Sequence, residues 1–439
     1  MVYENLFSYI VPVTLPPWNI PRELPVYQFT VAILCKAFNF DIETCSRCVS
    51  IVFFYLSTFL LYKVSKLIFK SLITARLSVL IFLFSPTYLF WSRTCMIESC
   101  ALFFSLGFLY YALTFVKKER LSIFGLFLFG IVAALVKITT FYPVVIFLFS
   151  YTLIYKKEVI INKKIWFIMS VIFLSVFFWY LYCKEVREFD FLFNNSGQEG
   201  FSWIFGFTEK LIDLQFYKIL WWEISSLVFP NFLFLLPLLV IGKNNFLYYT
   251  IIFAFFVASF TFANLYLHHD YYIYGSGFLI ILLVSFSICK IIKTYFRIKT
   301  FYSIYILLFV FLILNYTYLE KDYFRIQFKE HEDFLNFKNK IDLHVGPLEV
   351  GLICGEFCNP TLGYHLKRKC ATVGDYRNFP DAFPEILERI KDHCIKYGEP
   401  IKFVLLPKSG GYEKLCSSVS ETFGMKKNVV LDNYILFTN

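Results

Sequence analysis

Charged residues are scarce in this sequence. Asp, Glu, Lys and Arg together make up 17% of the 439 residues, whereas hydrophobic residues make up 58% and include 57 Phe and 31 Tyr. So small a charged share excludes an ordinary soluble globular protein. The apolar runs are about 16 to 23 residues long and are not the short alternating segments of an outer-membrane barrel. The composition therefore predicts an all-α polytopic membrane protein.

Other signatures are missing as well. We find no internal repeat, and the first 40 residues lack the charged start, apolar core and small-residue cleavage site of a signal peptide. The motif Cys45-Ser-Arg-Cys48 has no second cysteine pair to complete a zinc site, so we expect no metal there. Cys354 and Cys358 lie where oxidation is possible, but the even total of 12 cysteines does not predict disulfides.

The apolar runs predict ten membrane spans. They lie at about 46–62, 77–92, 98–116, 121–136, 139–155, 165–183, 219–241, 246–266, 273–289 and 300–318. Basic residues gather in alternate connections, at 63–76, 117–120, 156–164, 243 and 290–299. Because short cytoplasmic loops keep the positive charge, these connections are expected in the cytoplasm. Both ends of the chain are then expected on the outer face.

The chain is expected to have three parts: an extracytoplasmic segment at 1–45, a transmembrane helical domain at 46–318 and a small extracytoplasmic α/β domain at 319–439. In the first part, Val26–Phe40 is apolar but too short to span a bilayer, which favours an interfacial helix. In the last part, Leu348–Ile353, Phe403–Leu406 and Tyr434–Phe437 are predicted to be strands, and Phe383–Tyr397 and Thr361–Lys369 to be helices.

The net charge of +10 indicates orientation in a membrane. The tail from Glu320 to Asn439 holds 17 basic and 17 acidic residues, so the excess belongs to the membrane part and its cytoplasmic loops. We therefore expect membrane lipids as partners and no nucleic acid. The basic cluster at the end of Thr361–Lys369 is interpreted as a solvated helix end, or as a contact for anionic lipid headgroups.

The run Asn264–Tyr272 places two histidines and an acid between two predicted spans. Charge at a membrane boundary is costly, so it usually serves a function. The alternative is a short interfacial belt of Tyr and His. The functional interpretation makes His269, Asp270 and Tyr271 candidate site residues.

Two further acids, Glu23 and Glu98, are expected on the same outer face as Asp270. Glu98 begins the third span, where a simple capping role is the alternative because a helix N-terminus favours an acid. Arg93 precedes it by five residues. Lys137 lies between two apolar spans, where it can either snorkel to the interface or hold a phosphate.

Four motifs stand in an order and spacing that resemble a known family, the integral-membrane GT-C glycosyltransferases related to the protein mannosyltransferases and the aminoarabinose transferase (glycosyltransferase family 39-like). These motifs are Glu23–Gln28 after a Pro-rich segment, Ser85–Arg93 with Glu98 following, Leu135–Lys137 with Pro143, and His269–Tyr272. The resemblance covers nearly the whole chain. It implies an enzyme of the plasma (bacterial inner) membrane that moves a sugar from a polyprenyl-phosphate carrier to a lipid, glycan or protein acceptor.

The residue types fit that chemistry. A carboxylate must take the proton of the acceptor, and cations must hold the leaving phosphate. We expect Glu98 and Glu23 to be the catalytic acids. The expected donor- and phosphate-binding residues are Arg93, Lys137, His269, Asp270 and Tyr271. No cofactor or metal ligand is assigned, although a divalent cation is compatible with the reaction.

In one respect the sequence departs from the family pattern. The principal catalytic acid of the family usually stands just after the first transmembrane helix, and this sequence begins too late to contain it. Glu4 is the only acid near that place. Three interpretations follow: the sequence is truncated, Glu4 is the substitute, or the chain is inactive. Truncation is the one we prefer.

Two other functions are weighed against this one. A cell-surface glycan ligase or polymerase would share the outer face and the lipid-linked donor, so the sequence separates it less well. A transporter would need polar residues near the middle of the membrane, whereas here the spans are apolar and the charges gather at one face. The sequence argues against transport.

Overall fold

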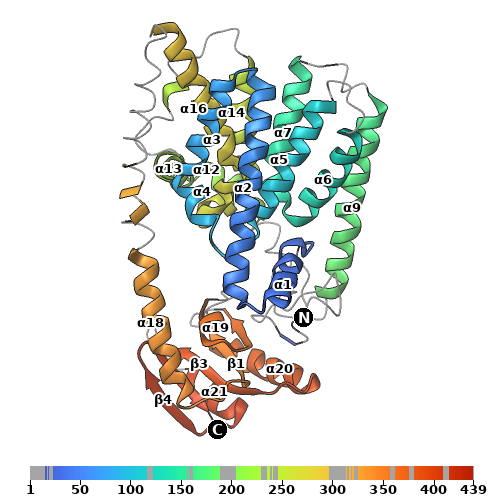
Figure 1. Cartoon of the computed structure of the whole chain (residues 1–439). Coiled ribbons are helices and arrows are strands. Elements are labelled where there is room, and N and C mark those ends of the chain that lie inside the picture. The colour runs from blue at the N-terminus through green and yellow to red at the C-terminus, as the bar shows by residue number, and fades with distance from the viewer. Residues whose placement is uncertain are drawn as a thin grey trace. The chain divides into compact units, whose positions relative to one another are not determined.

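The computed structural model describes most of the chain in two compact units (Figure 1). We call the described residues within 23–182 and 197–323 the membrane unit, and those within 1–22, 183–196 and 324–439 the α/β unit. The residues described are 15, 16, 18, 23–115, 122–155, 157, 162–187, 204–228, 235–237, 240, 246–295, 313, 316, 317, 319, 320, 325–355, 361–374, 380–408 and 415–438. The predicted domain limits at residues 45 and 318 stay a prediction.

The membrane unit is built from helices. Their bounds are α1 Val26–Phe38, α2 Ile42–Phe69, α3 Leu72–Phe84, α4 Pro86–Trp91, α5 Glu98–Phe115, α6 Ser122–Val136, α7 Ile138–Tyr155, α9 Lys163–Arg187, α12 Phe207–Ile212, α13 Leu214–Trp222, the π-helix η1 Glu223–Val228, α14 Phe246–Thr261, α15 Ala263–His268, the 3-10 helix η3 Asp270–Tyr272 and α16 Ile273–Tyr295. Local sequence sets several of these limits. Asp41 accepts a hydrogen bond from the backbone N–H of Thr44 and so caps α2, and Pro86 suits the first turn of α4.

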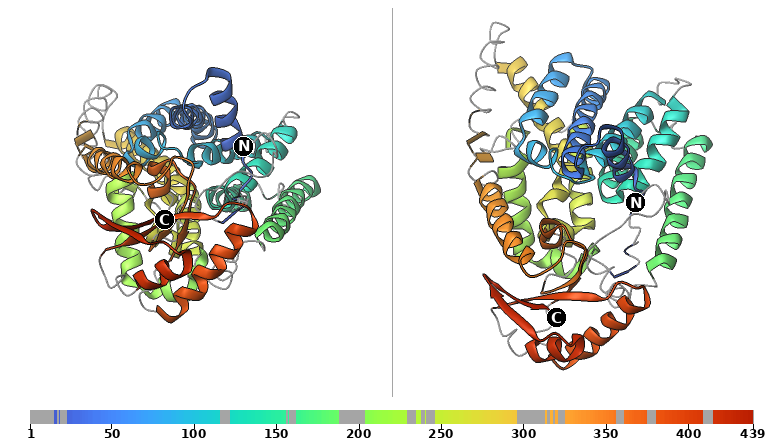
Figure 2. Two further views of the ribbon diagram at one scale, coloured as in Figure 1. Left: turned by 90° about the horizontal axis from the view of Figure 1, so that it is seen from below. Right: turned by 60° about the horizontal axis from the view of Figure 1, so that its bottom comes forward.

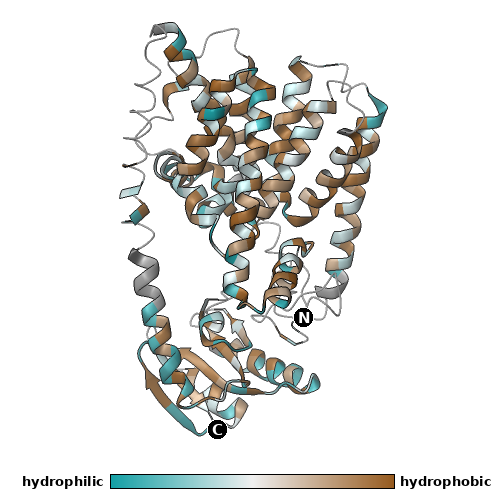
Figure 3. Ribbon diagram, viewed as in Figure 1, coloured by the Kyte–Doolittle hydropathy of each residue, from teal (hydrophilic) through white to brown (hydrophobic). Residues whose placement is uncertain are grey.

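Among the described residues, five helices are long and apolar enough to cross a membrane by length and composition. They are Ile42–Phe69, Glu98–Phe115, Ile138–Tyr155, Lys163–Lys184 and Asp270–Thr294. Shorter apolar helices accompany them, and hydrophobic residues dominate the long helices (Figure 3). The predicted all-α membrane fold is confirmed, and α5 and α7 match the predicted spans 98–116 and 139–155 closely.

Two predicted spans differ from single α-helices in their described parts. In the span 219–241, α13 ends at Trp222 and the π-helix η1 continues it to Val228. The span 77–92 is interrupted at Ser85, whose extended backbone separates α3 from α4. The proline at position 86 explains this break, since the residue before a proline is biased away from helical backbone. Most of the predicted span 300–318 lies outside the described residues.

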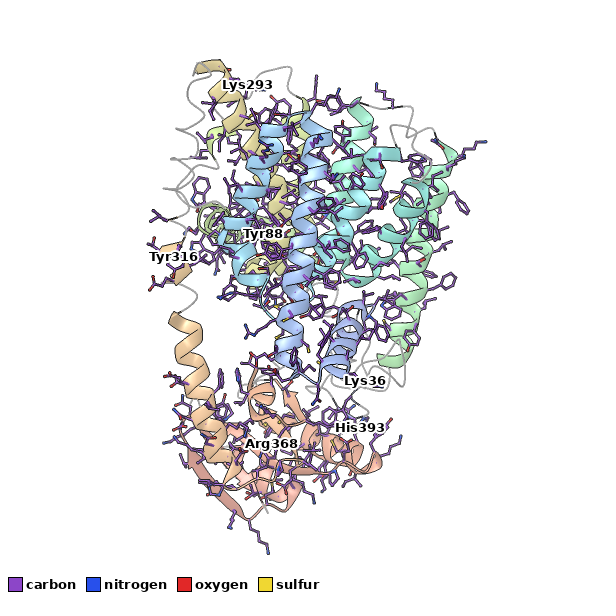
Figure 4. All side chains as sticks on the ribbon, in the orientation of Figure 1. Lys36, Tyr88, Lys293, Tyr316, Arg368 and His393 are labelled. Atoms are coloured by element: carbon purple, nitrogen blue, oxygen red, sulfur yellow. The ribbon has the colours of Figure 1, made fainter. Side chains whose placement is uncertain are left out.

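The helices that carry the candidate residues pack together. Helix α5 packs against α2, α6 and α7, while α16 packs against α3, α7 and α14 (Figure 2). Tyr88 of α4 is fully buried in the interior of this bundle (Figure 4). Its hydroxyl donates a hydrogen bond to the backbone oxygen of Tyr274 in α16 at 2.9 Å. This contact fixes α4 against the start of α16.

The α/β unit holds a five-stranded mixed sheet. Its strands are β1 Val350–Cys354, β2 Cys370–Val373, β3 Ile401–Pro407, β4 Lys427–Leu431 and β5 Tyr434–Thr438, in the order β2-β1-β3-β5-β4. Strand β1 pairs in parallel with β2 and β3, whereas β5 pairs antiparallel with β3 and β4. The three predicted strands are confirmed, and β2 and β4 are additional.

Helices cover both faces of this sheet, because side chains alternate along each strand. Ile353 and Leu405 pack with α18 and α19, while Leu352 and Val404 pack with α20 and α21 on the opposite face. The helix bounds are α18 Arg325–Asp342, α19 Thr361–Leu366, the 3-10 helix η6 Pro380–Ala382, α20 Phe383–Lys396 and α21 Cys416–Phe423. The predicted helix at Phe383–Tyr397 is thus confirmed by α20.

A short piece of the N-terminal segment packs into the α/β unit. We call it the Trp18 anchor, after a side chain that is only 1% exposed. The indole Nε1 of Trp18 donates to Glu399, the Nζ of Lys369 lies 5.6 Å from the indole ring, and Lys369 pairs with Glu399 at 2.8 Å. Nε2 of His393 donates to the backbone oxygen of Pro16 at 2.6 Å. Residues from the two ends of the chain therefore share one core.

The basic cluster after α19 is only partly solvated, because Lys367 is exposed whereas Arg368 is buried. The side chain of Arg368 is 2% exposed and pairs with Asp342 at 2.6 Å. Its guanidinium also donates to the backbone oxygens of Val345, Gly346 and Leu366. The predicted solvated end is therefore wrong for this residue, which binds α18 to the connection between α19 and β2 (Figure 4).

Asp342 predicts a pH dependence for the stability of the α/β unit. Partial burial raises the pKa of its carboxyl, but hydrogen bonds from Lys338 and Arg368 outweigh this and hold the pKa below its ordinary value. A carboxyl with a lowered pKa stabilises the fold above its unfolded-state pKa, and this stabilisation is lost as the pH falls through the folded-state value. We expect the free energy of unfolding to fall as the pH is lowered from about 5 toward 3. Chemical denaturation should show a smaller fall in Asp342→Asn, and an identical fall would refute the assignment.

The cysteine Cys354 is an inert core residue. It ends β1 in the buried core of the sheet, and burial raises the pKa of its thiol to about 12. A thiol rather than a thiolate is therefore present at neutral pH, and the thiol is the unreactive form. Cys358, which the sequence paired with it as a site of possible oxidation, lies outside the described residues.

Candidate functional site

The centre of the candidate site is a buried ion pair between Glu98 and Lys137. The Nζ of Lys137 lies 2.6 Å from Oε1 and 2.7 Å from Oε2 of Glu98. The side chain of Glu98 is 2% exposed and that of Lys137 is 13% exposed. Since a charge is rarely buried unless it is paired, this geometry favours a functional or structural role over the predicted alternatives of helix capping and snorkelling.

Helix ends present both partners. Glu98 is the first residue of α5, and Lys137 stands in the one-residue break between α6 and α7. The break is slight, because the backbone oxygen of Lys137 still accepts hydrogen bonds from the N–H groups of Thr140 and Phe141. The lysine is thus held on nearly continuous helix.

Two tyrosines of the predicted run 264–272 cover the lysine. Its Nζ lies 4.9 Å from the ring centre of Tyr271 and 4.6 Å from that of Tyr272. At these distances a ring attracts a cation. Tyr271 also stacks on His269, with ring centres 5.1 Å apart, and meets the edge of Trp91. The structure therefore brings His269 and Tyr271 together with Glu98 and Lys137.

The start of α16 is fixed beside the ion pair. The hydroxyls of Tyr274 and Ser99 are hydrogen-bonded at 2.9 Å, and Ser99 is the neighbour of Glu98. Gly275 lies so close to Thr140 of α7 that a Cβ atom would stand 3.0 Å from the Thr140 backbone. The absence of a side chain at this glycine lets α16 approach α7.

The N-terminal segment reaches the same region. The backbone N–H of Leu24 donates to the backbone oxygen of Leu135 at 2.9 Å. Glu23 precedes Leu24 and is half-buried, and Leu135 precedes Lys137 by two residues. The structure thus places the predicted acid Glu23 on the segment that adjoins the ion pair.

Arg93 lies in the connection between α4 and α5. Its guanidinium stands 5.8 Å from the ring centre of Phe90, and its backbone oxygen accepts a hydrogen bond from Arg47 of α2. Ser50 of α2 likewise donates to the backbone oxygen of Thr94. These contacts hold the connection that contains Arg93 against α2.

One acid of the region was missed by the sequence analysis. Glu223 begins η1 and is fully buried, and it interacts electrostatically with Asp270. A signal was available, because an ionisable residue inside an apolar run is by itself a functional hypothesis. Asp270 is in turn the first residue of η3, which also contains Tyr271 and Tyr272.

A metal site receives no support from the described residues. Among them, no group of three His, Cys, Asp or Glu side chains is arranged to hold a metal ion. We therefore derive no step that uses a metal.

Comparisons with known proteins agree with the fold. The family model of dolichyl-phosphate-mannose-protein mannosyltransferases matches residues 20–182. Two solved structures of ArnT from Cupriavidus metallidurans, one bound to undecaprenyl phosphate and one in the apo state, are similar over 99% of this chain and 90% of theirs. Each has a TM-score of 0.57 and 12% sequence identity. No curated protein matches the chain.

These findings agree with the predicted resemblance, since the family model matches residues 20–182 and the solved structures share the fold over nearly the whole chain. Together with the long apolar helices, they identify an integral membrane protein.

Proposed function

We propose that the chain is a membrane glycosyltransferase that takes a sugar from a polyprenyl-phosphate donor and passes it to a lipid, glycan or protein acceptor. The matching family of mannosyltransferases and the fold shared with a protein solved with undecaprenyl phosphate support this activity. The observation that carries the site is the buried pair of Glu98 and Lys137 beneath two tyrosines. This pair keeps a cation in an apolar setting, where it attracts a phosphate strongly.

The proposed reaction is a displacement at the anomeric carbon of the sugar. The acceptor oxygen attacks the anomeric carbon while its proton passes to a carboxylate. The bond from that carbon to the phosphate oxygen breaks, and the released phosphate keeps the electron pair. Lys137 stabilises this developing charge. A single displacement of this kind inverts the anomeric centre.

The acids Glu98 and Glu23 have different roles in this reaction. Both oxygens of Glu98 are bound to Lys137, so Glu98 holds the lysine in place rather than taking a proton. Glu23 is then the better candidate for the base, because its segment adjoins Lys137 through the bond from Leu24 to Leu135. His269, Asp270 and Tyr271 line the donor side, and Arg93 is a further phosphate contact.

A transfer assay tests this function. Membranes that contain the wild type, Glu98→Gln or Asp270→Asn are incubated with polyprenyl-phosphate sugars, and the transferred sugar is measured. We expect Glu98→Gln to lower the rate about 10²-fold or more, because Lys137 loses its charged partner. Asp270→Asn should lower it less. The control is Glu388→Gln, which alters an exposed pair with Lys391 on α20 and should leave the rate unchanged. Wild-type rates in both site variants would refute the site assignment.

We also propose that the site and the α/β unit face the outside of a plasma membrane of the bacterial inner-membrane type. The distribution of basic residues along the sequence supports this orientation, because the connections richest in Lys and Arg alternate with poorer ones. A polyprenyl-phosphate donor in the outer leaflet would be within reach of such a site.

A further inference from the structure

Glu223 stands out among the buried acids of the membrane unit. Its side chain is 0% exposed, and neither carboxylate oxygen has a hydrogen-bond partner in the described structure. Glu98, by contrast, has both oxygens bound to Lys137. A buried acid without a partner destabilises a protein, so it needs an explanation.

The described residues supply no hydrogen-bond donor to the Glu223 carboxyl oxygens. The hydroxyl of Tyr266 interacts with Glu223 electrostatically, but it donates its hydrogen bond to Ser276 at 2.8 Å. Asp270, which also interacts with Glu223 electrostatically, is a second acid and disfavours a negative charge there. The surroundings therefore favour the arrival of a group that donates hydrogen bonds or carries positive charge.

Ring contacts link the surroundings of Glu223 to the ion-pair site. The ring centres of Tyr266 and Tyr272 lie 6.3 Å apart, and that of Tyr272 lies 4.6 Å from the Nζ of Lys137. Asp270 and Tyr272 belong to the same 3-10 helix, η3. This helix thus carries both a ring that contacts the cation and an acid that interacts electrostatically with Glu223.

The backbone of Glu223 is held firmly. Its helix η1 is a π-helix, a form that is rare and occurs frequently at functional sites. The hydroxyl of Ser85 donates to the backbone oxygens of Leu227 and Val228 at the end of η1. Gly277 of α16 lies against Val228, where a Cβ atom would stand 3.1 Å from its side chain. The unpartnered acid is therefore part of a built arrangement.

We propose that Glu223 recognises the transferred sugar by accepting a hydrogen bond from one of its hydroxyl or ammonium groups. The proposal rests on the proposed function, in which the donor phosphate lies at Lys137. A second phosphate is a poor occupant because Glu223 and Asp270 are both acidic.

The test compares stability with activity in Glu223→Leu and Glu223→Gln. An acid kept for a ligand lowers the stability of the unliganded protein. We therefore expect Glu223→Leu to melt at the wild-type temperature or a few degrees above it in detergent. Glu98→Leu is the matched control, and it should melt several degrees lower because Lys137 loses its partner.

The activity arm uses undecaprenyl-phosphate hexoses and their monodeoxy analogues. We expect both Glu223 variants to lower kcat/KM for the preferred hexose about 10- to 100-fold. One deoxy analogue should be a poor substrate for the wild type but should lose no further activity in the variants. This pattern marks the hydroxyl that Glu223 binds.

Either arm can overturn the proposal. A melting temperature several degrees lower in Glu223→Leu would make the acid structural, and unchanged kcat/KM in both variants would remove it from the substrate site. If the wild type transfers none of the polyprenyl-phosphate sugars offered in the transfer assay, the proposed function fails. The melting temperatures then still decide whether Glu223 is held without a partner at a cost in stability.

Discussion

Replacement of Lys137 by alanine is expected to lower the free energy of unfolding by about 3–5 kcal/mol. The substitution leaves the carboxylate of Glu98 buried with no cation, and protonation of that acid relieves only part of the cost. Transfer activity is expected to fall about 10²–10³-fold as well, since the leaving phosphate loses its cation. Unfolding in detergent and a sugar-transfer assay measure the two effects.

A double variant separates these two effects. Replacing both partners, as in Glu98→Leu with Lys137→Met, removes the unpaired charge and should restore most of the stability. Activity should remain low, because no cation is left for the phosphate. If the double variant were as unstable as Lys137→Ala alone, unpaired charge would not be the cause. If it regained activity, Lys137 would not be the phosphate-binding residue.

Replacement of Arg368 by methionine is expected to destabilise the α/β unit by about 2–5 kcal/mol. Most of this loss comes from the backbone oxygens of Val345 and Leu366, which are buried and would have no donor. The pair with Asp342 contributes less, because that carboxylate is partly exposed and can be hydrated. Thermal unfolding of the full chain, followed by a probe in the α/β unit, measures the change.

The matched control for Arg368 is Lys402→Met. Lys402 lies on β3 with its side chain exposed, so the same removal of a positive charge should change the stability by no more than about 0.5 kcal/mol. Equal losses in the two variants would mean that charge, and not the buried hydrogen bonds, explains the effect.

Helix existence and some helix ends were predictable from the sequence. Glu98 marks the start of α5, and Lys137 marks the break between α6 and α7, because both polar residues interrupt apolar runs. Their contact was not predictable. The two residues are 39 positions apart, and no local pattern tells which helix ends meet in space. The packing of α5 against α6 and α7 brings them together.

The failures have equally specific causes. Hydropathy cannot distinguish a π-helix from an α-helix, so η1 and the acid that begins it were not recognised within the predicted span 219–241. Strand β4 was missed because its exposed Lys427 and Asn428 weaken the apolar signal of its N-terminal half. Arg368 stands in a run of three basic residues, which is typical of a surface cluster. Its burial was not predictable, since its partners come from the end of α18 and the residues that follow it.

The Trp18 anchor fixes an order of events during synthesis. Trp18 leaves the ribosome 381 residues before Glu399, the acid that its indole binds. At ordinary translation speeds this interval is roughly 20–80 s, long enough for a domain that needs only early residues to fold. The α/β unit cannot complete its core in that time, because one part of the core is the first described piece of the chain and the rest is the last. The side chain of Trp18 therefore has no binding pocket until translation is nearly finished.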